Sequence, residues 1–219
     1  MFRPGDTTWY ILYSSTGSYV GIGFGTSTDS PAPADYDGDG KTDIAVFRSS
    51  TSVWYIRPSS GGGSYYGYGF GTSGDVPTPA DYDGDGKADL GVWRDSNHQY
   101  YFLKTTDGLI GNVSVGASGD RPFPADYDGD GRADFGVFRD SNATWYIFQT
   151  STLTTVNYPF GASGDVLVPN DYDGDGKVDI ATWRDSNGNW YIRQSSSSTT
   201  RTEHWGMSGD IPVAAYYRR

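Results

Sequence analysis

A nine-residue acidic segment occurs four times in this 219-residue chain. The copies read DYDGDGKTD, DYDGDGKAD, DYDGDGRAD and DYDGDGKVD, and they begin at Asp35, Asp81, Asp126 and Asp171. Each copy has aspartates at positions 1, 3, 5 and 9. Four carboxylates in nine residues repel one another unless a cation neutralises them. Alternate spacing in a tight turn also points the carboxylates at one centre. The segment therefore predicts a metal-binding loop.

The other residues of the segment support the same chemistry. Glycines at positions 4 and 6 allow the positive φ angles that such a turn needs. The Lys or Arg at position 7 has only its backbone carbonyl to offer a cation. Ligation by oxygen atoms alone favours Ca²⁺ over Mg²⁺, which keeps several waters. We expect four Ca²⁺ ions, held by Asp35, Asp37, Asp39, Lys41, Asp43; Asp81, Asp83, Asp85, Lys87, Asp89; Asp126, Asp128, Asp130, Arg132, Asp134; and Asp171, Asp173, Asp175, Lys177, Asp179.

The loop differs from an EF-hand, which needs a bidentate Glu at position 12 between two helices. Position 12 is Val46, Val92, Val137 or Thr182, inside an apolar run typical of a strand. The alternative interpretation is an acidic turn exposed to solvent, which is common for a single DGDG sequence. Four complete copies favour the metal loop.

The charge balance agrees with bound calcium. The chain has 27 acidic and 16 basic residues and a net charge of −11, and sixteen of the acidic residues lie in the loops. Four Ca²⁺ ions would leave a net charge of about −3. The acidity is thus mainly ligand charge, and the chain lacks the basic face that nucleic-acid binding requires.

The composition predicts an all-β protein. The chain has 31 Gly, 18 Tyr and a single Glu, which is typical of sheets and turns. No apolar stretch reaches the length of a membrane span, and we find no N-terminal signal sequence, which suggests an excised module or a mature domain. The absence of cysteine leaves the redox compartment open. Calcium loops of this kind favour an extracellular or cell-surface location.

The acidic loops belong to a longer repeat, because they begin 46, 45 and 45 residues apart. An aromatic residue and an arginine follow each loop, and an aromatic triplet comes next. The N-terminus fits the same frame with Phe2-Arg3, Trp9 and Asp29, and the C-terminus stops at a partial loop in which Tyr216 takes the first ligand position. The chain therefore holds five units, one split between its ends, and we expect one domain over residues 1–219.

Each unit offers four strand-like runs, which in the second unit are VPTPADY, ADLGVWR, QYYFLK and GNVSVG. Four short strands per repeat of about 45 residues are the signature of propeller blades. Paired prolines such as Pro31 and Pro33 place the first run at a free sheet edge. We predict an all-β, five-bladed propeller of four-stranded blades. Its ring would close by pairing the C-terminal run 211–217 with the N-terminal strands.

The pattern GD.P.PADYDGDGK.D…[FW]R…WYI resembles the FG-GAP/VCBS repeats of bacterial surface proteins and the integrin α-subunit propeller. The resemblance covers nearly the whole chain. It implies propeller blades whose calcium loop joins the first and second strands, with the aspartates named above as ligands. Two departures stand out. Integrin propellers have seven blades, and the fifth unit here, with Tyr216, Tyr217 and Arg218, lacks the metal ligands. A related fungal lectin binds sugars between blades, but no motif here matches its sugar site.

Two further residue sets recur with the repeat. The arginines and the Gly-Asp aspartates are equal in number and form either a ligand clamp or, as we expect, bidentate pairs between strands or blades. The tryptophans are expected in the core between blades. The members are Arg3, Arg48, Arg94, Arg139, Arg184; Asp29, Asp75, Asp120, Asp165, Asp210; and Trp9, Trp54, Trp145, Trp190.

The sequence favours a binding module over an enzyme. His98, His204 and Glu203 lie in no repeated or catalytic motif. We expect an interaction, adhesion or scaffold module, monomeric, with a protein or glycan partner. The first alternative is a lectin-like module with repeated sites between blades, since Tyr65, Tyr66 and Tyr68 stand in a Gly/Ser-rich stretch. The second is a non-catalytic domain of a larger secreted enzyme. Fold alone does not choose among these.

Overall fold

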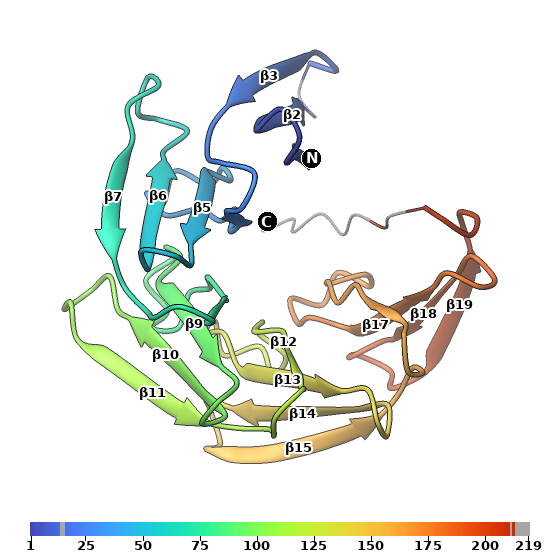
Figure 1. Ribbon diagram of the computed structural model, residues 1–219. Coiled ribbons are helices and arrows are strands. Elements are labelled where there is room, and N and C mark those ends of the chain that lie inside the picture. The colour runs from blue at the N-terminus through green and yellow to red at the C-terminus, as the bar shows by residue number, and fades with distance from the viewer. Residues whose placement is uncertain (14–15, 211, 213–219) are drawn as a thin grey trace. The chain divides into compact units, whose positions relative to one another are not determined.

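The computed structural model describes residues 1–13, 16–210 and 212, and these residues form nineteen β-strands joined by turns (Figure 1). Within this part of the chain no helical segment has the length and hydropathy of a membrane span. The strands are β1 (Phe2–Arg3), β2 (Thr8–Leu12), β3 (Tyr19–Gly23), β4 (Ser30–Pro31), β5 (Ile44–Arg48), β6 (Val53–Arg57), β7 (Tyr66–Gly69), β8 (Val76–Pro77), β9 (Leu90–Arg94), β10 (Gln99–Leu103), β11 (Ile110–Ser114), β12 (Arg121–Pro122), β13 (Phe135–Arg139), β14 (Thr144–Gln149), β15 (Thr154–Pro159), β16 (Val166–Leu167), β17 (Ile180–Arg184), β18 (Asn189–Arg193) and β19 (Thr200–His204).

Each repeat forms one sheet whose strands lie in chain order. The four sheets β4–β7, β8–β11, β12–β15 and β16–β19 have four strands each, and β1–β3 form a sheet of three described strands. Strand pairs within these sheets, such as β13 with β14, are antiparallel. The all-β class and the five-bladed propeller architecture are thus confirmed. Of the run 211–217, predicted to close the ring, only Pro212 lies within the described residues.

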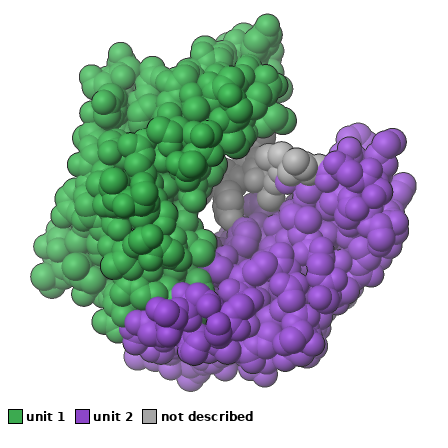
Figure 2. Space-filling view, in the orientation of Figure 1, with its two compact units in different colours: residues 1–81, 85–94, 101–112 green, residues 82–84, 95–100, 113–219 purple. Residues whose placement is uncertain are grey.

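The chain divides into two compact units, which Figure 2 colours green and purple. The first consists of residues 1–81, 85–94 and 101–112, and the second of residues 82–84, 95–100 and 113–219. The first unit holds the first two sheets, the second unit holds the last two, and the third sheet contributes to both. The single domain over residues 1–219 stays a prediction.

The first strand of each four-stranded sheet is shorter than the sequence predicts. The run VPTPADY forms only the two-residue strand β8, and an isolated bridge between Ala80 and Asp89 follows it. The prolines explain this difference, because they cannot donate to a strand ladder. In the second sheet Ala32 N–H donates to Ala45 O at 2.9 Å. Pro31 and Pro33 flank Ala32, so their nitrogens face the free edge, as predicted.

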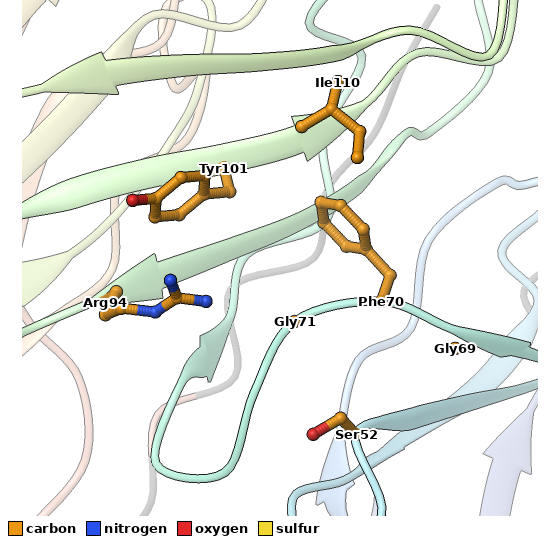
Figure 3. A pocket seen from close by; sticks show the side chains of 7 residues that line it. All are labelled: Ser52, Gly69, Phe70, Gly71, Arg94, Tyr101 and Ile110. Carbon is orange, nitrogen blue, oxygen red and sulfur yellow. The ribbon is translucent and has the colours of Figure 1, made fainter.

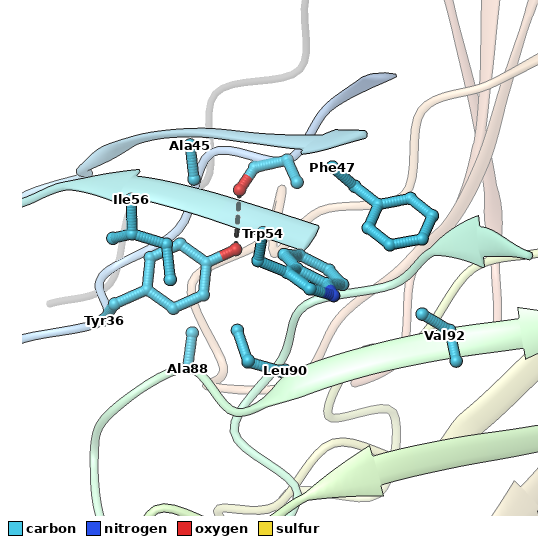
Figure 4. Close-up of a cluster of buried hydrophobic side chains, with 9 residues drawn as sticks. Tyr36, Ala45, Phe47, Trp54, Ile56, Ala88, Leu90 and Val92 are labelled. Atoms are coloured by element: carbon cyan, nitrogen blue, oxygen red, sulfur yellow. Dashed lines mark hydrogen bonds between the residues drawn. The ribbon is translucent and has the colours of Figure 1, made fainter. Parts of the chain in front are cut away.

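The core of the first unit lies between successive sheets. Phe47 and Trp54, both fully buried, pack with Leu90 and Val92 of β9 (Figure 4). In the same cluster the hydroxyl of Tyr36 donates to the carbonyl of the buried Ala32 at 2.7 Å. Central strands covered on both faces read as continuous apolar runs, which accounts for sequences such as IAVF in β5.

The same packing recurs in the second unit, where Trp145 is fully buried in a cluster that includes Ile180 of the following sheet. Trp9 packs with Val46 of the next sheet in the first unit. The predicted place of Trp9, Trp54 and Trp145 between blades is confirmed. Trp190 is only partly buried, and it packs beside the cluster around Trp183. Each of these four indoles donates its N–H to a main-chain carbonyl near the end of the outer strand.

Candidate metal centres

Each acidic loop joins the short first strand of a sheet to its second strand, as the family resemblance implies. In the second sheet the loop 35–43 runs from the end of β4 to β5. Its base is closed by a bridge in which Asp43 N–H donates to Ala34 O at 2.7 Å. Equivalent bridges close the other three loops. The strand pairing therefore holds both ends of each loop at a constant separation.

The first aspartate organises the turn within the loop. Asp35 accepts hydrogen bonds from Gly38 N at 2.7 Å and from Gly40 N at 2.9 Å. Both glycines have φ of 81°, a conformation that side chains with a Cβ rarely adopt. The loops that begin at Asp126 and Asp171 repeat these bonds. The predicted need for glycine at positions 4 and 6 is confirmed.

In every loop three carboxylates converge, with one oxygen from each lying within 4.8 Å of the others. Oxygens bound to one Ca²⁺ at 2.3–2.6 Å lie at most about 5 Å apart. The residues present thus fit a cation with oxygen ligands. The groups are Asp35, Asp37, Asp39; Asp81, Asp83, Asp85; Asp126, Asp128, Asp134; and Asp171, Asp173, Asp179.

These groups contain three of the four aspartates predicted for each loop. Asp43 is outside the first group, and its two carboxylate oxygens accept the N–H groups of Tyr36 at 2.9 Å and Ser59 at 2.7 Å. Asp130 and Asp175, at position 5, are outside the third and fourth groups. The fourth aspartate thus supports the loop through hydrogen bonds where it does not join the cluster.

Several of these carboxyl groups are partly buried, and burial disfavours their ionised form. Burial raises the pKa of Asp134 to about 6, although hydrogen bonds from Thr150 and Tyr127 oppose the shift. Burial also raises the pKa values of Asp126 and Asp179. A cation bound among these groups would favour their ionised forms. The arrangement can bind a hard cation.

The basic residue at position 7 has a role that the sequence analysis did not predict. Lys87 extends over Gly38 of the preceding loop, where a Cβ would meet its Cγ and Cε at 3.1 Å. The neighbouring Ala88 N–H donates to Asp35 O at 2.7 Å. In the second unit Lys177 covers Gly129 in the same way. Successive loops of a unit therefore contact one another.

The repeated arginines form the expected bidentate pairs. Arg48 donates to both carboxylate oxygens of Asp29, at 2.8 and 2.9 Å, and its guanidinium lies 4.5 Å from the centre of the Tyr55 ring. The pairs Arg94–Asp75, Arg139–Asp120 and Arg184–Asp165 repeat this geometry. At the chain ends the partners differ. Arg3 contacts Asp6 at 3.4 Å, and Asp210 accepts the N–H of Met207.

Two shallow pockets have matching linings. One, of about 390 Å³, lies in the first unit between the second and third sheets, where Arg94 and Tyr101 face Phe70 (Figure 3). The other, of about 380 Å³, lies in the second unit and has Arg139 and Tyr146 in the corresponding places. The remaining lining residues are Ser52, Gly69, Gly71 and Ile110 in the first pocket, and Asn97, His98, Ser114, Val115, Gly116 and Thr155 in the second.

The residues weighed for other functions lie on the surface. Tyr65, Tyr66 and Tyr68 are 64%, 46% and 48% exposed. Glu203 pairs with Arg201 on the exposed strand β19, and His204 contacts Asn189. The glutamate and the histidine therefore have separate partners. The sequence analysis also missed the Ser or Thr residues after the third strand of each four-stranded sheet, among them Ser59, Thr105, Thr150 and Ser195, that contact the acidic loops. The signal was present, since SS, TT, TS and SS follow the loops at positions 59, 105, 150 and 195.

Comparisons with known proteins agree with this fold. Residues 35–92 and 81–137 match the model of the FG-GAP-like repeat. No curated protein matched significantly. A catalytically inactive virginiamycin B lyase from Staphylococcus aureus superposes with a TM-score of 0.59 at 11% identity, over 92% of this chain and 64% of the lyase. A chain of the Mitotic Checkpoint Complex gives 0.53 at 8% identity, over 90% and 60%. A Lactobacillus plantarum protein gives 0.50 at 14% identity, over 93% and 67%.

These identities support the fold alone, and the chain spans less than two thirds of the first two structures. The repeated sheets and their acidic loops define a β-propeller with one potential cation site in each four-stranded blade. Residues 35–137 of this propeller carry the matched FG-GAP-like repeats.

Proposed function

We propose that this protein is a calcium-binding propeller that acts outside the cell as an interaction or adhesion scaffold. The observation that carries the proposal is the convergence of three carboxylates in each of four loops. Carboxylate and carbonyl oxygens are the ligands of Ca²⁺. Four ions would also offset most of the net charge of −11. The ions would stabilise the loops, and each loop joins the first two strands of its blade.

A binding role without catalysis suits the groups on the surface. The converging aspartates are committed to the loops, and Glu203 and His204 have separate partners on an exposed strand. Propeller folds often bind proteins, and FG-GAP repeats are typical of extracellular proteins, so we propose a protein or glycan ligand and a monomeric scaffold. Calcium sites of this class fill at the concentrations found outside cells.

Thermal unfolding with and without calcium tests the main proposal. A ligand that binds only the folded state adds about 2.7 kcal/mol per site at a hundredfold excess over Kd. We expect excess EGTA to lower the melting temperature markedly and added Ca²⁺ to restore it. Calorimetric titration should show about four sites, one for each carboxylate group. A melting curve unchanged by EGTA, together with no heat of binding, would reject calcium as the ligand.

A second candidate is glycan binding between blades. The observation in its favour is the pair of matching pockets, each with an arginine and a tyrosine from one sheet and several residues from the sheet before. Aromatic faces beside polar groups suit sugar recognition, and repeated weak sites gain from avidity. The test is a glycan array probed in calcium with the natural protein and the Tyr101→Ala plus Tyr146→Ala variant. A variant of exposed tyrosines, Tyr66→Ala plus Tyr68→Ala, separates the pockets from the surface. Absence of any glycan signal would leave the scaffold proposal alone.

A further inference from the structure

The hairpin between the third and fourth strands of a blade reaches the acidic loop of the same blade. In the second sheet this hairpin joins β6 to β7. The hydroxyl of Ser59 donates to Asp39 Oδ2 at 2.7 Å, and the Ser59 N–H donates to Asp43 Oδ1 at 2.7 Å. The hydroxyl of Ser60 donates to Asp37 Oδ2. Two consecutive serines thus hold three of the four aspartates of the loop.

The same contacts recur in the fourth sheet. Thr150 donates its N–H to Asp134 Oδ1 at 2.8 Å and its hydroxyl to Asp130 Oδ2 at 3.0 Å. Ser151 donates its hydroxyl to Asp128 Oδ2 at 2.6 Å. The partners are separated by 16, 20 and 23 residues, as they are in the second sheet. The hairpin and the loop therefore meet in a constant register.

The remaining four-stranded sheets extend the pattern. In the fifth sheet Ser195 binds Asp179 and Asp175, and Ser196 donates to Asp173 at 2.6 Å. In the third sheet Thr105 donates its N–H to Asp89 at 2.7 Å and its hydroxyl to Asp85 at 2.9 Å. The contact thus accompanies every complete acidic loop in the part of the chain that the structure describes.

These donors bind carboxylates of like charge, which repel one another. A hydroxyl bound to one oxygen of a carboxylate stabilises its charge and fixes its orientation. Groups that hold metal ligands in this way matter almost as much as the ligands, and their loss typically weakens metal binding about 10- to 100-fold. The Asp37 and Asp128 side chains are members of the converging groups, so the second hydroxyl acts on a ligand directly.

We propose that the paired Ser and Thr residues of each outer hairpin are positioning residues for the cation sites, so that each site has two parts, the acidic loop and the hairpin. This inference rests on the proposed binding of calcium. Because coupling is reciprocal, a cation in the loop also orders the hairpin and the start of the outer strand. The outer strands carry exposed residues such as Tyr66. Calcium would thereby stabilise a surface available to partners.

The test compares two double variants of the full chain. Ser151→Ala plus Ser196→Ala removes the hydroxyls that bind Asp128 and Asp173. Thr152→Ala plus Ser197→Ala is the matched control, because these hydroxyls bond only to neighbours within the hairpin, Thr154 and Thr199, at 2.8 Å. After EGTA treatment and its removal, each protein is titrated with Ca²⁺ in a calorimeter. We expect two of the four sites to weaken about tenfold in the first variant and no change in the control.

Two further measurements separate positioning from general stability. Ser151→Thr plus Ser196→Thr keeps the hydroxyls, as the natural Thr106 does in the third sheet, and should retain the natural affinity. If the double alanine variant fails to fold, the single variant Ser196→Ala takes its place. Its calcium affinity is then compared with that of the double threonine variant. In hydrogen exchange, calcium should protect the hairpins 150–153 and 194–199 in the control and less in the alanine variant.

The outcomes are distinct. Equal calcium affinity in the alanine variant and the control would overturn the inference and leave the calcium proposal intact. So would an alanine variant that melts lower by the same amount in EGTA and in calcium, since that result describes a purely structural role. If the natural protein binds no calcium, the proposed function fails first, and this inference fails with it.

Discussion

Arg139 binds both carboxylate oxygens of Asp120, with Nε donating to Oδ1 and Nη2 donating to Oδ2, each at 2.9 Å. The aspartate side chain is 2% exposed and the arginine side chain is 27% exposed. Tyr146 lies beneath the guanidinium, 4.4 Å from ring centre to Cζ. The pair joins the turn before β12 to the end of β13. Because the pair is repeated in other sheets, it is a structural ion pair of the blade.

Removing this arginine should destabilise the protein, because Asp120 would stay buried without its partner. We expect Arg139→Met to lower the free energy of unfolding by about 2–3 kcal/mol, somewhat below the cost for fully buried pairs. Arg139→Lys should recover only part of that, since lysine cannot bind two oxygens in a fork. Urea unfolding in calcium measures the change. The exposed pair of Arg201 and Glu203 supplies the control, and Arg201→Met should have no measurable effect.

The equivalent pair in the second sheet predicts a pH dependence. Burial opposes the charge of Asp29, but hydrogen bonds from Arg48 and Thr26 outweigh burial and lower its pKa below 3.8. A carboxyl with a lowered pKa in the folded state stabilises the fold above about pH 4, and this contribution is lost as the pH falls through the folded pKa. Asp29→Asn should therefore be less stable at pH 7 and lose less stability between pH 4 and pH 2. Urea unfolding across this range tests it, and parallel curves for the two proteins would contradict it.

One glycine is required by close packing. A Cβ on Gly136 would lie 2.6 Å from Phe123 O and 3.2 Å from the ring of Tyr127. We expect Gly136→Ala to cost about 1–3 kcal/mol of unfolding free energy, because the inner strand must shift. The same place in two other sheets is Ala45 or Ala181. Ala181→Gly should therefore cost only about 1 kcal/mol, through the flexibility of glycine. Denaturant unfolding of both variants measures these losses of unfolding free energy. Equal losses in the two variants would argue against a steric cause.

The stoichiometry of calcium binding should follow the loops one at a time. Asp128→Asn removes one carboxylate of the third converging group and should reduce four calorimetric sites to three. Asp107→Asn is the control, since Asp107 lies in an exposed turn beside Lys104. We expect it to retain four sites. A titration of Asp128→Asn with four unchanged sites would place the cation outside this loop.

Repeat spacing and residue type were enough to predict the blades and the loops. Four acidic segments at a period near 45 residues, each followed by strand-like runs, are local patterns, and local patterns survive in any packing of the chain. The proline pairs likewise placed the first strand at its edge, although the strand is shorter than the run VPTPADY suggested. The arginine pairs were predicted because charge, number and spacing matched.

Other features depended on strand register and on contacts between distant segments. The sequence named four aspartates per loop, but only three converge in each, and the one left out is Asp43 in the first loop and Asp130 in the third. The hydroxyl pairs sit 16 to 23 residues from their aspartates. Their role follows from antiparallel pairing that returns the outer hairpin to the loop. The repeated Ser and Thr pairs are visible in the sequence, but their spacing names no partner, so only the folded sheet could assign them to the candidate cation sites.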